Sequence, residues 1–165
     1  MTHVDLRTLR LLPGDHRRLD VPIAIAPFTA GMQEYRADPA ELEARLGLTR
    51  LQGGLLFDLA FEVTVTGPCQ RCLEPAHETL AVTAREYQAD HPEVVDQETT
   101  PYLVGERLDA DRWATDATIL ALPLVIRCRE DCAGLCPQCG SDLNVVACGC
   151  TPPEDARWER LRELL

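Results

Sequence analysis

The stretch that decides the fold is LLFDLAFEVTVT, which runs from Leu55 to Thr66. Large apolar side chains fill every odd position, whereas the even positions carry mostly Asp, Glu and Thr. A two-residue period of this kind places one face of a β-strand in the core and the other in water. A second extended run, His77–Tyr87, follows after ten residues, so we expect an antiparallel hairpin.

The residues before this hairpin carry one strand signal and one helix signal. The run LDVPIAIA, Leu19–Ala26, predicts a strand, and Pro22 favours a sheet edge because proline has no N–H to donate. Residues 38–47 begin with Asp38, Pro39 and Glu41, which is typical of a capped helix start, and end at a glycine. We therefore predict a helix over residues 38–47.

Two more helices are predicted after the hairpin. The first covers Asp109–Leu122 and ends at Pro123. The second begins near Pro153, and its apolar residues recur at helical spacing, so that it can dock on the body. The apolar stripe of the first is Trp113, Ala117, Leu120 and Ala121, and that of the second is Trp158, Leu161 and Leu165.

These elements predict an α+β fold, with an antiparallel β-sheet or partly open barrel, flanking helices and a C-terminal cysteine-rich zinc-knuckle segment. The expected organisation is an α+β core over residues 1–126, which includes the Cys69/Cys72 hairpin. A cysteine-rich metal-binding segment over 127–152 and a docking helix over 153–165 complete it.

The net charge is −11 over 165 residues, and every one of the 16 basic residues is Arg. Residues 74–116 alone carry −8, whereas residues 7–18 carry +3. An acidic chain binds polyanions poorly, because binding to phosphates depends on cations that displace counterions. The composition therefore argues against a general DNA-binding protein.

No secretory signal is visible near Met1, and the longest uncharged apolar stretch, Ala117–Ile126, is too short to span a bilayer. We expect a cytoplasmic protein without a membrane association. In a reducing compartment, closely spaced cysteines are metal ligands or redox centres more often than disulfides.

Six of the eight cysteines lie in CREDCAGLCPQCGSDLNVVACGC, residues 128–150. Cys136 and Cys139 form a Cys-Pro-Gln-Cys-Gly zinc knuckle, in which a tight turn points two thiolates at one ion. Four thiolates would leave no open position, so we expect structural and not catalytic zinc. The expected ligand set closes this pair with Cys132 and Cys148, and Cys150 is the nearest competitor. The remaining candidate ligand of the segment is Cys128.

Cys69 and Cys72 form the second CxxC, at the tip of the predicted hairpin. Three interpretations stay open: a half-site of a zinc shared with the tail, a structural turn or contact surface, and a redox pair. The redox interpretation is the weakest, because a thioredoxin-type CxxC starts a helix, whereas Pro68 and Pro75 flank this one. Arg71 lies between the thiols, where it could contact phosphate or a partner.

The sequence contains no nucleophile elbow, P-loop or dinucleotide fingerprint, and its four histidines are scattered. We therefore expect no enzymatic activity and no small-molecule substrate.

Three blocks of the sequence together resemble the YceD family, the large ribosomal RNA subunit accumulation proteins. They are VTGPCQRCLEPA (65–76), CREDCAGLCPQCGSDLN followed by CGC (128–150), and the terminal DARWERLRELL (155–165). The last resembles the family's Asp-Pro-Arg-Trp box, with Ala156 in place of the proline.

The resemblance implies a bacterial cytoplasmic protein (plastid in plants) that supports accumulation of large-subunit ribosomal RNA without being an enzyme. The family's gene often neighbours that of a small large-subunit ribosomal protein, which implies a protein partner. Some members keep the hairpin CxxC but lack the tail cysteines, which argues against a shared zinc.

Two modes of action follow from the charge distribution. In the first, the acidic stretch 74–116 binds a basic large-subunit ribosomal protein, a pairing that the net charge favours. In the second, the chain binds ribosomal RNA precursor directly through arginines. The candidate contacts are Arg7, Arg10, Arg17, Arg18 and Arg71. A thiol-redox sensor at the hairpin CxxC is a further alternative.

Overall fold

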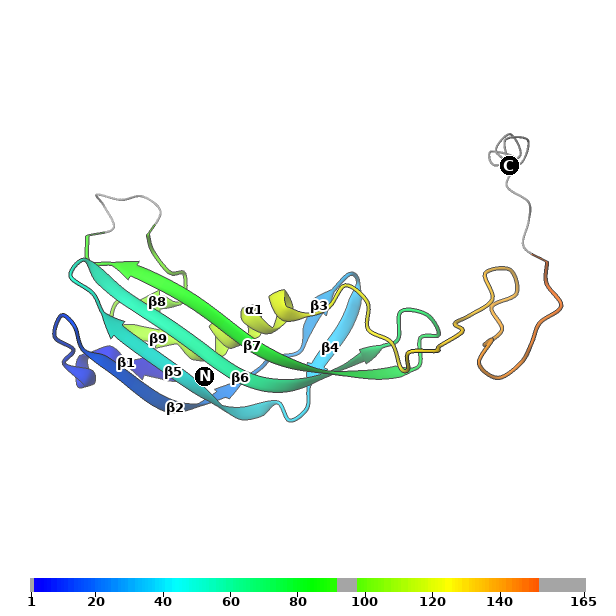
Figure 1. Cartoon of the computed structure of the whole chain (residues 1–165), viewed down its shortest axis with the longest axis horizontal. Coiled ribbons are helices and arrows are strands. Elements are labelled where there is room, and N and C mark those ends of the chain that lie inside the picture. Colours follow the sequence, from blue (N-terminus) through cyan, green and yellow to red (C-terminus); the bar gives the residue numbers. More distant parts are fainter. Residues whose placement is uncertain (1, 92–97, 152–165) are drawn as a thin grey trace, which may run out of the picture.

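The computed structural model describes residues 2–91 and 98–151, and its element order is shown in Figure 1. Antiparallel strands are the main secondary structure of the described residues, which include one α-helix. The first half contains β1 (His3–Asp5), the short 3₁₀ helix η1 (Leu6–Leu9), β2 (His16–Ala24), β3 (Phe28–Ala30), β4 (Gln33–Ala37) and β5 (Glu41–Arg50). The second half contains β6 (Gly54–Pro68), β7 (Pro75–Ala89), β8 (Leu103–Val104), β9 (Arg107–Asp109) and α1 (Ala110–Ala121). Among the described residues, no helix is long and apolar enough to cross a membrane.

The predicted hairpin is confirmed and forms the spine of the main sheet. β6 and β7 are 15 residues each and pair antiparallel along their whole length, from Gly54–Ala89 to Pro68–Pro75. β6 also pairs with β5 along one half and with β4 near its end. The sheet continues from β5 to β2 and from β4 to β3, so that β2 is an edge strand, as Pro22 predicts. It stays open, and a smaller sheet of order β1-β9-β8 lies beside it.

The predicted helix over residues 38–47 is wrong, because residues 41–47 belong to β5. Leu42, Ala44, Leu46 and Leu48 face inward while the alternate residues face outward, which is the two-residue period of a strand. The cap signal at Asp38–Glu41 is local, whereas pairing with both β2 and β6 satisfies the backbone along the segment. Tertiary pairing therefore decides the structure here.

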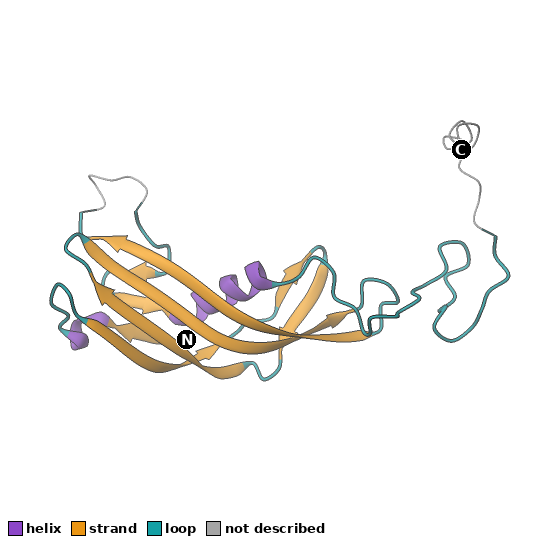
Figure 2. Ribbon diagram, in the orientation of Figure 1, coloured by secondary structure: helices purple, strands orange, loops and turns teal. Residues whose placement is uncertain are grey.

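The predicted helix over Asp109–Leu122 is confirmed as α1, with Asp109 as its N-cap. The helix packs on one face of the sheet, as Figure 2 shows. Its predicted apolar stripe is only half right, because Trp113 and Ala117 are buried whereas Leu120 and Ala121 are exposed. The buried stripe is Ala110, Trp113, Ala114, Ala117 and Thr118. The predicted helix from Pro153 lies outside the described residues.

The core lies between α1 and the inner face of the sheet. Trp113 is 1% exposed, meets Phe57 edge-on at 6.4 Å between ring centroids and stacks on Tyr102 at 6.0 Å. At the other end of the sheet, Phe28 stacks on Tyr35 at 5.8 Å. The inward residues of β6 that the sequence predicts, from Leu55 to Val65, are all buried.

Gly67 offers a direct test of how tightly the side chains around the Phe28–Tyr35 pair are packed. A Cβ at Gly67 would overlap the ring of Tyr35, which is 1% exposed and has no room to move. We expect Gly67→Ala to lower the free energy of unfolding by about 1–3 kcal/mol, measured by urea denaturation. Gly53→Ala is the matched control, since its Cβ would make only an ordinary 3.6 Å contact with the Tyr87 hydroxyl. Equal stabilities of the two variants would contradict the packing described here.

Candidate metal centres

The eight thiols gather into two groups of four, and within each group all four sulfur atoms lie within 4.8 Å of one another. No disulfide links any of them. The first group, which we call the hairpin cluster, is Cys69, Cys72, Cys128 and Cys132. The second, which we call the tail cluster, is Cys136, Cys139, Cys148 and Cys150. Both groups could hold a metal ion, and an all-thiolate donor set is consistent with zinc.

The loop between β6 and β7 supplies the first two thiols of the hairpin cluster. The Cys69 N–H donates to the carbonyl of Glu74 at 2.7 Å, and the Leu73 N–H donates to the carbonyl of Cys69 at 2.9 Å. These bonds close a tight turn, in which Leu73 has a φ of 66°. The turn buries both cysteines, with Cys69 at 0% and Cys72 at 5% exposure.

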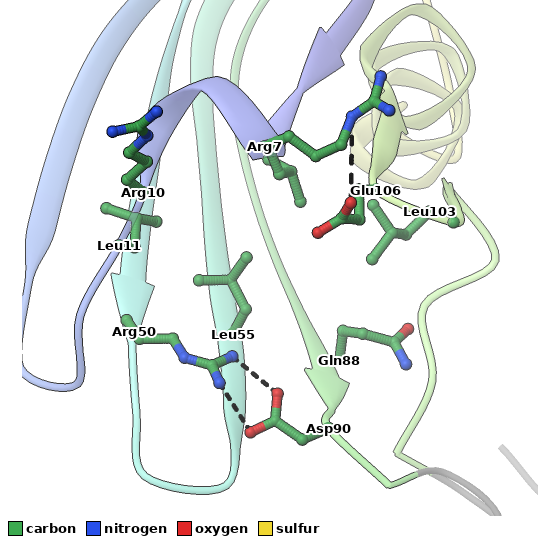
Figure 3. Close-up of a pocket in the computed structure, with 11 residues that line it drawn as sticks. Arg7, Arg10, Leu11, Arg50, Leu55, Gln88, Asp90, Leu103 and Glu106 are labelled. Atoms are coloured by element: carbon green, nitrogen blue, oxygen red, sulfur yellow. Dashed lines mark hydrogen bonds and ion pairs between the residues drawn. The ribbon is translucent and has the colours of Figure 1, made fainter.

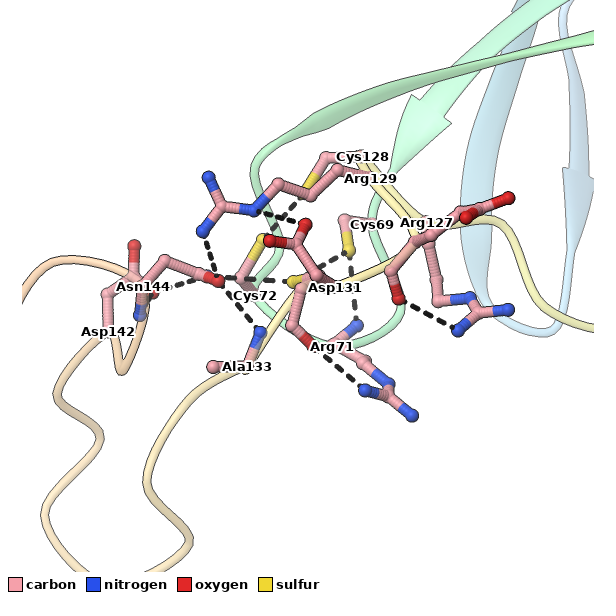
Figure 4. Close-up of polar contacts among 12 residues, drawn as sticks. Cys69, Arg71, Cys72, Arg127, Cys128, Arg129, Asp131, Ala133, Asp142 and Asn144 are labelled. Carbon is pink, nitrogen blue, oxygen red and sulfur yellow. Dashed lines mark hydrogen bonds and ion pairs between the residues drawn. The ribbon is translucent and has the colours of Figure 1, made fainter.

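The segment after α1 docks on this loop and supplies the other two thiols (Figure 4). The Gln70 N–H donates to the Ile126 carbonyl at 3.0 Å, and the Leu135 N–H donates to the Arg71 carbonyl at 3.0 Å. The Arg71 guanidinium in turn donates to the Cys132 carbonyl at 2.8 Å. Gly134 permits this approach, because its φ is +79° and a Cβ there would lie 3.0 Å from the Arg71 carbonyl oxygen. The loop and the segment therefore form one docked unit.

The sulfur separations in the hairpin cluster fit a tetrahedral metal site. Cys69 Sγ and Cys132 Sγ are 3.8 Å apart, and Cys72 Sγ and Cys128 Sγ are 3.6 Å apart. Four sulfurs at about 2.3 Å from a zinc ion form a tetrahedron with edges of about 3.8 Å. A disulfide would instead need about 2.05 Å. The donors present therefore fit zinc in both identity and spacing.

The tail cluster is built entirely within residues 136–150. The Cys136 N–H donates to the Ser141 carbonyl at 2.8 Å, and the Gly140 N–H donates to the Cys136 carbonyl at 2.9 Å. This is the tight turn that the Cys-Pro-Gln-Cys-Gly motif predicts, and Gly140 has the positive φ, 72°, that the turn requires. Cys139 and Cys150 are exposed, so this cluster lies closer to solvent than the first.

Each cluster holds at least one thiol whose surroundings favour the thiolate. Burial alone would raise the pKa of Cys69, but backbone N–H donors led by that of Cys128 outweigh it and lower the pKa to about 6. Hydrogen bonds with the hydroxyl and then the backbone of Ser141 lower the pKa of Cys139 to about 6. Backbone N–H groups of Cys139 and Gln138 lower the pKa of Cys136. Thiolates are the form that binds metal.

The structure groups the cysteines differently from the expected ligand set of Cys132, Cys136, Cys139 and Cys148. Cys132 lies in the hairpin cluster, and both Cys148 and Cys150 lie in the tail cluster. The reason is tertiary, because docking on the hairpin loop carries Cys128 and Cys132 to thiols some 60 residues earlier in the sequence. Cys69 and Cys72 share a cluster with two cysteines of residues 128–150, as the shared half-site hypothesis requires. They do not lie with the knuckle pair, Cys136 and Cys139.

Asn144 is a residue that the sequence reasoning missed. Its side-chain N–H lies 3.6 Å from the Cys132 sulfur, and its side-chain oxygen accepts from the Ala133 N–H and from Arg129, each at 2.8 Å. It thus supports the hairpin cluster although it lies between the tail-cluster cysteines in the sequence. No spacing rule for zinc ligands marks such an asparagine.

The Cys69/Cys72 pair lies in a loop of turns that joins two strands, and no helix begins there. A helix N-terminus lowers thiol pKa values in thioredoxin-type pairs. The lowered pKa of Cys69 therefore has a different cause.

The five candidate arginines do not form one surface. Arg17 and Arg18 are consecutive in β2 and so point to opposite faces of the sheet. Arg7 pairs with Asp5 at 2.6 Å, and Arg71 is bound to the Cys132 carbonyl. Arg10 and Arg7 both line a cavity of about 410 Å³ (Figure 3). In the same cavity, Arg50 donates two hydrogen bonds to Asp90, at 2.7 and 2.9 Å.

Comparison with known proteins assigns the chain to a family. The family described as "Large ribosomal RNA subunit accumulation protein YceD" matches residues 57–165, which include both cysteine clusters. The chain belongs to the YceD family. Uncharacterized proteins of Mycobacterium bovis and Mycobacterium tuberculosis are 32% identical to it over 98% of this chain and 80% of their own length. An uncharacterized protein of Mycobacterium leprae is 32% identical over 66% of this chain and 54% of its own length. No solved structure matches the chain.

Membership in the YceD family suggests a role in the accumulation of large-subunit ribosomal RNA. The family is not known as an enzyme family. The two groups of four thiols could each hold a metal ion.

Proposed function

We propose that this YceD protein is a non-enzymatic assembly factor, which supports accumulation of large-subunit ribosomal RNA by binding a basic large-subunit ribosomal protein. The ribosomal role is supported by the family, whose description names it. The choice of a protein partner over direct RNA binding rests on the distribution of charge.

The observation that carries the protein partner is the arrangement of the N-terminal arginines. A phosphate-binding face needs several cations that are free and point the same way. Here Arg17 and Arg18 point to opposite faces, and the Arg7 charge is balanced by Asp5 and Glu106. Arg50 is similarly held by Asp90. The N-terminal arginines therefore do not gather on one cationic face for an RNA backbone.

The acidic stretch has the opposite character. It carries −8 over residues 74–116, in which Asp90 and Glu106 pair with Arg50 and Arg7. Its exposed carboxylates include Glu98, at the end of the sheet where β7 ends. Complementary charge accelerates and orients association with a basic protein. A basic ribosomal protein held in this way is kept from nonspecific contact with RNA until assembly.

The test is purification of the full-length protein from crosslinked cells, with and without nuclease. We expect a basic ribosomal protein to remain bound after nuclease treatment. Recovery of RNA with a steep salt dependence, and no protein after nuclease, would overturn the proposal. In binding assays with the recovered partner, Glu98→Gln should weaken affinity. Glu34→Gln, outside the acidic stretch, is the matched control and should not.

The proposal also assigns zinc to the tail cluster. The knuckle turn, the glycine with positive φ and the four sulfurs within 4.8 Å of one another favour a metal–thiolate centre. The zinc would be structural, because four cysteines occupy all four positions of a tetrahedral ion.

A further inference from the structure

We propose that the hairpin cluster is a second zinc site, independent of the tail cluster, so that the chain holds two zinc ions and shares no ligand between them. The ligands are Cys69, Cys72, Cys128 and Cys132. This inference does not depend on the ribosomal role, and either can fail without the other.

The first support is the fit of the donors to one ion. Both sulfur separations, 3.8 and 3.6 Å, are close to the edge of a tetrahedron of sulfurs around zinc, which is about 3.8 Å. Each separation joins one sulfur of the hairpin loop to one sulfur of the segment that docks on it. Four converging sulfurs at this spacing enclose a position about 2.3 Å from each of them.

The second support is the surroundings of the sulfurs. Metal-bound thiolates are usually oriented by N–H donors in the shell around the ligands. The Arg71 N–H lies 3.4 Å from the Cys69 sulfur, and the Asn144 side-chain N–H lies 3.6 Å from the Cys132 sulfur. Four thiolates and one zinc ion carry a net charge of −2. Arg71, Arg127 and Arg129 lie near the site, with Arg129 paired to Asp131 at 3.2 Å. Such cations offset the cost of burying that charge.

The third support is the small number of large apolar side chains at this junction. Cys69, Cys72 and Cys132 are buried, yet large apolar side chains contribute little where the segment docks, with Ile126 buried and Leu135 half-buried. A few backbone hydrogen bonds and the Arg71 contact connect the loop and the segment. A metal ion bound to two thiolates from each side would supply the missing connection.

The two sites are separate in construction. The tail cluster draws all its ligands from 15 consecutive residues, whereas the hairpin cluster joins ligands about 60 residues apart. The tail site therefore depends on a local turn, and the hairpin site depends on docking. Each can be removed without removing a ligand of the other.

The experiment measures zinc per chain in the full-length protein by elemental analysis. We expect two ions in the wild type and one in each of two matched variants, Cys69→Ser with Cys72→Ser and Cys136→Ser with Cys139→Ser. Combining the two variants should leave none. One zinc in the wild type, with the hairpin thiols reacting freely with a thiol reagent, would overturn the proposal.

A triple variant decides to which site Cys132 belongs. Adding Cys132→Ser to Cys69→Ser and Cys72→Ser should still leave one zinc, because all three residues serve the same ion. If Cys132 belonged to the tail site, the triple variant would lose both ions, and the grouping would be wrong. Cobalt provides a second readout, since the thiolate-to-cobalt absorption of the wild type should be twice that of either double variant.

Discussion

Removal of zinc by a strong chelator is expected to unfold the segment from Arg127 to Thr151 while the main sheet stays folded. Among the described residues this segment has no helix or named strand, and one isolated bridge joins Leu135 to Asp142. Zinc binding in small metal-dependent peptides contributes about 10–16 kcal/mol, and its loss should leave the segment unfolded.

Limited proteolysis before and after chelation measures this effect. Cleavage should become rapid within the segment, while a fragment that contains β2 to α1 resists and keeps its β-sheet circular dichroism. Re-addition of zinc is the control and should restore protection. A segment that stays protected without metal would show that packing alone holds it.

The second large effect is expected from Trp113→Ala, which should lower the free energy of unfolding by about 3–5 kcal/mol. Trp113 is 1% exposed, lies between α1 and the sheet, and contacts the rings of both Phe57 and Tyr102. Its removal leaves a cavity that neighbouring side chains cannot fill without leaving their own packing.

Urea denaturation followed by circular dichroism measures the loss. Leu120→Ala is the matched control on the same helix, because Leu120 is 85% exposed and should cost little. The control also tests the phase of the helix, since the sequence alone assigns Leu120 and Trp113 to one stripe. A larger loss of unfolding free energy for Leu120→Ala than for Trp113→Ala would contradict the orientation of α1 described here.

The parts of the fold that the sequence predicts are those with a strong local signal. The alternation in Leu55–Thr66 is long and unbroken, so β6 and its hairpin partner are confirmed. Residues 38–47 carry two conflicting signals, a helix cap and a two-residue alternation, and pairing with β2 and β6 decides between them. A local cap is worth about 1 kcal/mol, which a ladder of hydrogen bonds outweighs.

The cysteine motifs are visible in the sequence, but their grouping is not. The knuckle at Cys136 and Cys139 is local, and the structure keeps it intact. Cys132 is nearer to that knuckle along the chain than to Cys69, yet it lies against Cys69 because the loop and the segment dock. Docking depends on contacts such as Arg71 with the Cys132 carbonyl, which no spacing pattern records.

The length of the central hairpin has a consequence for reach. Strands of 15 residues extend about 50 Å at about 3.4 Å per residue. The hairpin loop that carries the cysteine segment therefore lies far from the opposite end of the sheet, where β6 begins and β7 ends (Figure 1). The two ends of the hairpin are therefore separate surfaces, and a molecule bound at one end would leave the other end accessible.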